Sequence, residues 1–227
     1  LTVEDSVGNG KITYAQGSSN VGWTVDVEGA FILESGTIEL TGDSWSIGYA
    51  VDVRPNSWGT AYTNATTFTM NGGSISECSA GSNGGAVYME GGTVTLSGGT
   101  IFNNLAQRGN GGGIYATGQI QLLLAANVYN NKAKNGGGIY VDGGVELQFG
   151  NGLIVSNQAA EVGGGIYLSK GQLAFTDTQN FGIYNNSADV EAADIYASGL
   201  GTQILLPNVV TMDLKGFASK QIMAEVD

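Results

Sequence analysis

The chain has 227 residues, with 20 acidic and 8 basic side chains, a formal net charge of −12, one cysteine and no histidine. These counts exclude a disulfide framework, histidine-dependent catalysis and histidine-ligated metals. A nucleic-acid-binding surface is also excluded, because 8 dispersed cations cannot neutralise a phosphate backbone within so acidic a chain. No apolar run is long enough to span a membrane. The chain begins at Leu1 without a basic and apolar leader, and we expect it to be part of a larger chain.

The first third of the chain, residues 1–70, predicts irregular strands. Two segments, Thr24–Val27 and Ala50–Val53, alternate apolar and polar residues as a half-buried strand does. All 3 tryptophans of the chain lie in this third.

An aromatic insertion at 54–68 interrupts the spacing of the later repeats. Aromatic rings beside amides and charged groups can form platforms for sugar rings. The candidate ligand-binding residues, from this insertion and the strands before it, are Trp23, Trp45, Arg54, Asn56, Trp58 and Tyr62. The alternative is that the aromatic side chains cap the exposed end of a repeat array.

Residues 71–200 contain regular repeats of about 26 residues. The string Gly-Gly-x-(Val/Ile)-Tyr occurs at 84–88, 111–115, 136–140 and 163–167, with a decayed copy at 192–196. Its β-branched residue has counterparts at Val25 and Val51. The glycines fit corners that need a positive φ or close backbone packing.

A second string, apolar-x-x-Asn-x-Ala, runs in phase with the first. Its asparagines are Asn104, Asn131, Asn157 and Asn186, and Cys78 occupies the same slot one repeat earlier. We expect each asparagine to adopt the left-handed conformation at a corner and to donate a hydrogen bond to its neighbour in a ladder. Cys78 is expected to be a small buried residue.

Each repeat also contains a third strand-like segment, found at 93–96, 119–122, 145–148 and 172–175. Three short strands per repeat, with no helical window, predict an all-β fold: a single-stranded right-handed parallel β-helix, or β-solenoid, of about seven to eight coils. We expect one domain over 1–227, in which 201–227 forms the last coil or a C-terminal cap.

Three outward features follow from this arrangement. The tyrosines Tyr88, Tyr115, Tyr140, Tyr167 and Tyr196 should form a column, which either stabilises the sheet or presents an aromatic strip to a partner. Asp26 and Asp52 should share this column in adjacent coils, beside Glu28 and Arg54. Two close carboxylates can act as acid and base, can hold Ca²⁺ with Glu28, or can be neutralised by Arg54. A charged ridge, including Lys134 and Glu161, should precede the glycine strings.

The paired strings resemble the GGA(I/V)Y and (I/F)xxNxA repeats of polymorphic outer-membrane protein adhesins, and the pectate-lyase-like β-helix repeats of large bacterial surface proteins. The resemblance covers residues 70–200 clearly and 1–70 loosely. It implies an extracellular location on a bacterial cell surface.

The resemblance also implies a non-catalytic adhesin or carbohydrate-binding module whose partner is a host or plant glycan or a surface protein. The alternatives are a passive structural stalk and a polysaccharide-degrading enzyme, a glycosidase or lyase that would use Asp26 and Asp52. We expect no cofactor, with Ca²⁺ as the one candidate. The acidic charge predicts weak binding to anionic polymers unless Ca²⁺ bridges them.

Overall fold

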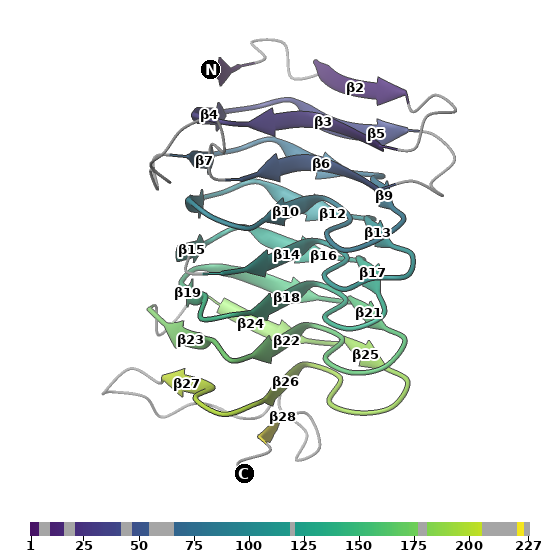
Figure 1. Cartoon of the computed structure of the whole chain (residues 1–227), viewed down its shortest axis with the longest axis vertical. Helices are drawn as coiled ribbons and strands as arrows, with labels where there is room; N and C mark the ends of the chain where they lie inside the picture. The colour runs from purple at the N-terminus through teal and green to yellow at the C-terminus, as the bar shows by residue number, and fades with distance from the viewer. Residues whose placement is uncertain are drawn as a thin grey trace.

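The computed structural model describes residues 1–4, 10–15, 21–41, 47–54, 66–118, 121–176, 181–205 and 222–224. Short strands stack along one axis, with the N-terminus at one end and the C-terminus at the other (Figure 1). Every strand pairing in these ranges is parallel, and strands of one coil pair with the equivalent strands of the next. The predicted fold class, an all-β parallel β-helix, is confirmed.

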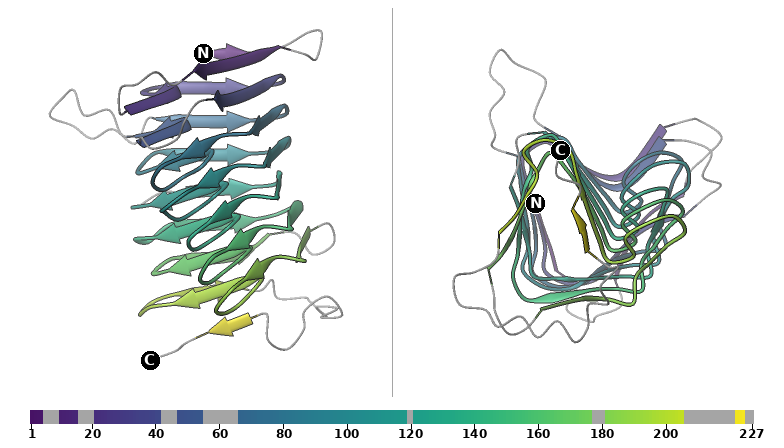
Figure 2. Two further views of the ribbon diagram at one scale, coloured as in Figure 1. Left: turned by 90° about the vertical axis from the view of Figure 1, so that its right-hand side faces the viewer. Right: turned by 90° about the horizontal axis from the view of Figure 1, so that it is seen from below.

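Four sheets form the walls of the stack (Figure 2). The first sheet contains β1 (Thr2–Val3), β4 (Ala30–Leu33), β7 (Thr67–Met70), β11 (Thr93–Leu96), β15 (Gln121–Leu124), β19 (Glu146–Phe149), β23 (Gln172–Phe175) and β27 (Gln203–Leu205). The second contains β2 (Lys11–Ala15), β5 (Thr37–Thr41), β8 (Ser74–Ser76), β12 (Thr100–Phe102), β16 (Asn127–Tyr129), β20 (Gly152–Val155) and β24 (Phe181–Tyr184).

The third sheet carries the repeated tyrosines. It contains β3 (Val21–Val27), β6 (Ile47–Val53), β10 (Val87–Met89), β14 (Ile114–Thr117), β18 (Ile139–Asp142), β22 (Ile166–Ser169), β26 (Ile195–Ser198) and β28 (Ile222–Ala224). The fourth is made of two-residue strands: β9 (Ser79–Ala80), β13 (Leu105–Ala106), β17 (Lys132–Ala133), β21 (Gln158–Ala159) and β25 (Ser187–Ala188).

The hydrophobic core is a set of side-chain columns along the axis. The predicted anchors pair in register from Val25 through Val51 and Val87 to Ile195, and Ile222 of β28 continues the column. The next inward residue of each repeat is buried as well, as predicted, from Met89 to Ala197. Because equivalent residues stack directly, the alternation within one strand fixes the core of the whole molecule.

The asparagine ladder is confirmed and runs between the second and fourth sheets. The Oδ1 atom of Asn131 accepts two hydrogen bonds from Asn104, one from its backbone N–H at 3.0 Å and one from its side-chain Nδ2 at 2.9 Å. The Nδ2 atom of Asn131 donates in turn to Asn157 Oδ1 and to the carbonyl oxygen of Ile101, both at 3.0 Å. Each buried amide is thereby satisfied by its neighbours in the adjacent coils.

Cys78 begins the ladder, as the spacing predicted. It is 1% exposed, and its backbone N–H donates to Asn104 Oδ1 at 3.1 Å. Its thiol lies 3.1 Å from the carbonyl oxygen of Ser76. A small side chain suffices at this position because the ladder has no asparagine in the coil before it.

The structure corrects the predicted conformation of the corner. The left-handed residues are Asn103, Asn130 and their equivalents, one position before each ladder asparagine. The ladder asparagines are absent from the residues with positive φ. The corner therefore divides two tasks: one residue turns the chain, and the next places its amide inward.

Three details of the repeat also differ from the prediction. The stack completes about six turns, slightly fewer than the predicted seven to eight. Each regular coil has four strands, because the residues after the ladder asparagine pair as a fourth, two-residue strand. The third segment is displaced in two coils, since Gln121 and Glu146 align with Thr93. The strand begins seven residues after the anchor in these coils, at Gln121 after Ile114 and at Glu146 after Ile139, but six residues after Val87 in the coil of Thr93.

Glycine is required at the corner before the third sheet for two separate reasons. Gly111 has a φ of +67°, a conformation that L side chains rarely adopt. A Cβ on Gly112 would collide with the carbonyl oxygens of Lys132 and Gly137 in the next coil. The glycine strings therefore encode the close stacking of corners, as the sequence indicated.

Candidate functional site

Most of the predicted aromatic site lies outside the described residues. This applies to Trp45, Asn56, Trp58 and Tyr62. The backbone of Trp23 lies in β3 opposite Tyr49 of β6, but its side chain is outside the described part of the chain. Arg54 is the predicted residue whose surroundings the structure describes, and it follows β6 directly.

The predicted carboxylate column is present. Asp26 and Asp52 are register partners on β3 and β6, and Asp52 pairs with Tyr88 on β10 in the same way. The two carboxylates differ sharply in environment, because Asp26 is exposed whereas Asp52 is 1% exposed. A carboxylate as buried as Asp52 needs a partner to remain charged.

Arg54 is that partner. Its Nε donates to Asp52 Oδ1 at 2.8 Å, and it lies 4.0 Å from the carboxylate of Glu90. The guanidinium carbon lies 5.3 Å from the ring centre of Tyr88 and 5.8 Å from that of Tyr49, within cation–π range. Asp52 and the two tyrosine rings hold the Arg54 side chain in place, and 41% of it nevertheless remains exposed to solvent.

Burial dominates the electrostatics of Asp52. Desolvation raises its pKa from 3.8 to about 6, Arg54 opposes the rise, and the nearby Asp26 and Glu90 carboxylates add to it. The pKa values of Tyr49 and Tyr88 are also raised, mainly by burial. Both tyrosines are therefore neutral hydrogen-bonding groups at physiological pH.

The site includes two residues that the sequence analysis missed, Tyr49 and Glu90. Tyr49 stacks on Tyr88 with ring centres 4.3 Å apart and is 4% exposed. Tyr88 Oη donates a hydrogen bond to Glu90 Oε1. Tyr49 lies two residues before its anchor Val51, whereas the repeated tyrosines follow theirs by one. The repeat therefore gave no signal for Tyr49.

The predicted tyrosine column is confirmed as a continuous stack. Ring centres of successive tyrosines from Tyr88 to Tyr196 lie 4.6 to 5.3 Å apart, and Tyr49 extends the column by one ring. The column is half-buried, and Tyr49, Tyr88 and Tyr115 pack with Ala80. This packing favours the stabilising interpretation over an open aromatic strip.

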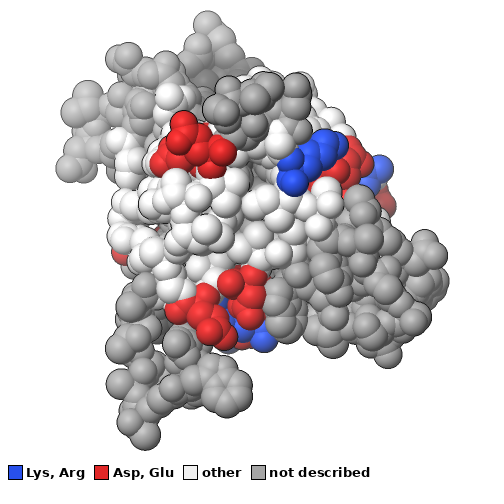
Figure 3. Space-filling model, turned by 90° about the horizontal axis from the view of Figure 1, so that it is seen from above, with Lys and Arg blue, Asp and Glu red and all other residues white. Residues whose placement is uncertain are grey.

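The described residues offer little for a metal ion. No group of three or more potential acidic or thiol ligands occurs among them, and the proposed Ca²⁺ ligands Asp26, Glu28 and Asp52 do not form such a group. Seen from the N-terminal end, the described acidic side chains form separate small groups (Figure 3). The described ranges also contain no candidate membrane-spanning helix.

Comparison with protein-family models, with curated proteins and with solved structures finds no match. The chemistry of the site is therefore inferred from the positions of its side chains. The Arg54 side chain, which is 41% exposed, carries guanidinium donors suited to a carboxylate or hydroxyl, and Glu90, with its side chain 44% exposed, offers an acceptor beside it. Asp52 is covered and bound to Arg54, an arrangement that orients the guanidinium.

Proposed function

We propose that this chain is an extracellular segment of a bacterial surface protein that binds carbohydrate without catalysing a reaction, as an adhesin or carbohydrate-binding module. The observation that carries the proposal is the placement of Arg54. It rests on two tyrosine rings, is fixed by a buried carboxylate and remains 41% exposed. Prepositioned donors bind a ligand at a low cost in conformational entropy.

The neighbouring sequence supports a sugar as the ligand. Arg54 and Glu90 together provide the donors and acceptor that fix hydroxyl groups. The sequence directly after Arg54 supplies Trp58 and Tyr62, residue types on which the C–H faces of sugars stack. A host or plant glycan, or a glycosylated surface protein, is the partner that this combination fits.

The burial of Asp52 disfavours the enzymatic alternative. A glycosidase of the retaining type needs two carboxylates that both reach the scissile bond. Asp26 is exposed, but Asp52 is 1% exposed and its Oδ1 is occupied by Arg54. Asp52 is thus arranged to hold the guanidinium of Arg54, and a polysaccharide-cleaving role is the weaker proposal.

We propose a cell-surface location because the repeats of this chain resemble those of bacterial surface proteins. Their stacked coils form a scaffold along which binding surfaces are displayed. The same scaffold also suits a passive stalk, which is the competing proposal and differs in binding nothing.

A glycan array probed with the wild-type chain tests the proposal. We expect binding to a defined set of glycans, weakened at least about tenfold, or about 1.4 kcal/mol, by Arg54→Lys. The lysine keeps the positive charge beside Asp52 but lacks the planar fork of arginine. The control variant Lys11→Gln should bind as wild type does, because Lys11 lies on β2 and pairs with Glu39 of β5, whereas Arg54 follows β6.

Binding to no glycan or surface protein would support the stalk. Release of reducing ends or unsaturated uronates from polysaccharides, if lost in Asp26→Asn, would support the enzyme. Circular dichroism of each variant establishes that it retains the β-helix.

A further inference from the structure

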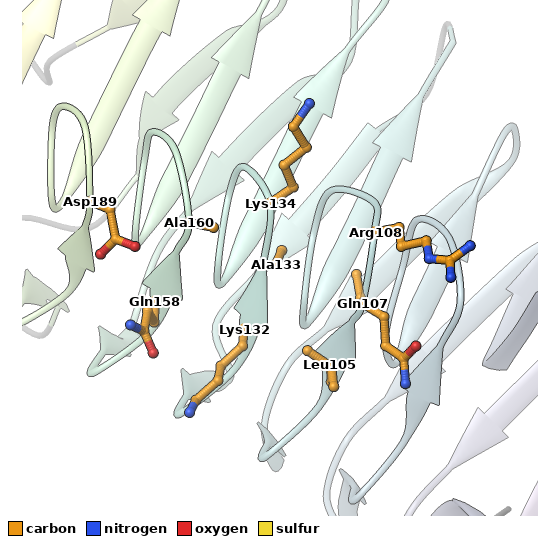
Figure 4. A pocket seen from close by; sticks show the side chains of 10 residues that line it. Leu105, Gln107, Arg108, Lys132, Ala133, Lys134, Gln158, Ala160 and Asp189 are labelled. Carbon is orange, nitrogen blue, oxygen red and sulfur yellow. The ribbon is translucent and has the colours of Figure 1, made fainter. Parts of the chain in front are cut away.

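A hollow of about 390 Å³ lies along the fourth sheet and the corners that follow it (Figure 4). It is lined by residues of β13, β17 and β21 and of the loops after them. It is separate in sequence and sheet from the Arg54 site, which lies at the end of β6 in the third sheet. Coils stack about 4.8 Å apart, so the hollow presents the same slots repeatedly along the axis.

The hollow concentrates positive charge on an acidic protein. Of the 8 basic residues in a chain of net charge −12, Arg108, Lys132 and Lys134 line it. All three side chains are exposed. Lys132 and Lys134 extend in opposite directions on either side of the hollow (Figure 4). One acidic residue, Asp189, belongs to the lining at the C-terminal end.

The lysines remain accessible to a ligand. Lys132 forms no ion pair with any described residue, and Lys134 lies 3.4 Å from Glu161. The side chains of Lys134 and Glu161 are 51% and 47% exposed, so their attraction contributes about 0–1 kcal/mol. An anionic ligand can therefore replace Glu161 at little cost.

The surroundings of the cations indicate the type of ligand. Gln107 and Gln158 lie among the same lining residues and can donate to or accept from hydroxyl groups. The backbone of β13 is already hydrogen-bonded to β9 on one side and to β17 on the other. A peptide therefore finds no free strand edge here and cannot bind by adding a strand.

We propose that this hollow binds an acidic oligosaccharide that lies along the stack. Its carboxylate or sulfate groups contact Lys132, Lys134 and Arg108, and its hydroxyl groups contact Gln107 and Gln158. The hollow is thus a local exception to the weak binding of anionic polymers that the net charge predicts. The proposal is independent of the Arg54 site, because the two sites share no residue.

Isothermal titration calorimetry with four probes tests the proposal: an oligogalacturonate, a heparin-derived oligosaccharide, a neutral oligosaccharide and an oligoglutamate. We expect one or both acidic saccharides to bind, more weakly as salt is raised and equally with and without EDTA. The uronate and sulfate arms identify which anion is preferred. Lys132→Gln should weaken binding about tenfold, which corresponds to about 1.4 kcal/mol.

Lys11→Gln is the matched control, since it makes the same change in net charge on β2. Arg54→Lys should leave binding at the hollow unchanged, which separates this proposal from the Arg54 site. Equal loss in Lys11→Gln and Lys132→Gln would overturn the proposal, as would equal binding of the neutral oligosaccharide. Equal binding of oligoglutamate would overturn the choice of a saccharide, and binding lost in EDTA would overturn direct contact with the lysines.

Discussion

Asn186 donates both its backbone N–H and its side-chain Nδ2 to one carboxylate oxygen, Asp194 Oδ1, at 3.2 and 2.8 Å. Asp194 thereby takes the place of the next asparagine and ends the ladder. It occupies the third position of the decayed glycine string, where Gly165 stands in the preceding coil. Its other oxygen, Oδ2, is buried without a hydrogen-bond partner among the described residues.

Replacing Asp194 by asparagine should stabilise the fold at neutral pH. Burial raises the pKa of Asp194, and the bonds from Asn186 only partly oppose this. A carboxyl group whose pKa is higher in the folded state binds its proton more tightly there. Its charge therefore destabilises the fold at high pH, and the effect is relieved as the pH falls through the folded-state pKa. Asp194→Asn retains an Oδ1 acceptor and removes the charge.

Urea denaturation at several pH values measures this difference. The stability advantage of Asp194→Asn over wild type should be greatest near neutral pH and should shrink toward pH 4. Asp194→Ala is the control, since it removes the acceptor of Asn186 and should destabilise the fold by about 1–3 kcal/mol. An advantage of Asp194→Asn that is independent of pH would contradict the assigned role of the charge.

A substitution in the middle of the ladder should reduce the stability of the fold more than one at its end. Asn131→Ala leaves both the N–H and the Nδ2 of Asn104 without the Oδ1 acceptor they share, in a fully buried position. We expect a loss of about 3 kcal/mol or more, because each buried donor left unpaired costs about 1–3 kcal/mol. Thermal and urea denaturation measure it.

The adjacent residue provides the control for this prediction. Asn130 has a φ of 54°, and glycine adopts that conformation without strain. The free energy of unfolding of Asn130→Gly should therefore be close to that of wild type. If both variants lost equal stability, the corner conformation rather than the ladder would be the critical feature.

The fold was predictable because the repeat imposes one arrangement many times. Val87, Ile114 and Ile139 occupy one slot of consecutive strings, and stacking of equivalent residues follows from the parallel pairing alone. The fourth sheet was not predictable, since two-residue strands carry too few residues to alternate visibly. The predicted position of the left-handed residue was wrong by one, because the repeated asparagine marks the ladder amide more strongly than the residue that turns the chain.

The candidate sites were predictable only in part, because they depend on departures from the repeat. The register of Asp26 with Asp52 followed from the anchors. The burial of Asp52, the stacking of Tyr49 on Tyr88 and the approach of Glu90 to Arg54 were not predictable, because no repeated motif encodes them. The charged ridge was expected from the sequence, but only as a solvated surface, because Arg108, Lys132 and Lys134 are followed by acidic residues along it and no motif marks a hollow there.

The titration of Asp52 should be visible near neutral pH. Its pKa is raised to about 6, and the groups that face it are Arg54, Asp26, Glu90 and Tyr49. NMR of the carboxyl carbon should give a midpoint near this value in the folded protein. Arg54→Gln should raise it further, because the guanidinium favours the charged form.

The stability of the fold should follow the same titration. The folded pKa of about 6 exceeds the ordinary value of 3.8, so the ionised Asp52 destabilises the fold above pH 6. This cost decreases as the pH falls from 6 toward 3.8. Asp52→Asn should therefore change stability most at pH 7 and least at pH 4. A midpoint near 4 in the wild-type protein would show that solvent reaches Asp52 more freely than its burial indicates.

The tyrosine column should stabilise the stack through its rings rather than its hydroxyl groups. Tyr140 lies between Tyr115 and Tyr167, with ring centres 5.3 and 4.6 Å away. Tyr140→Ala removes two stacked pairs, each of which contributes about 0.5–1.5 kcal/mol beyond burial. We expect a loss of about 1–3 kcal/mol in Tyr140→Ala and little change in Tyr140→Phe, measured by urea denaturation. Equal losses in the two variants would assign the stabilisation to the hydroxyl group and leave the stacked rings free to contact a partner.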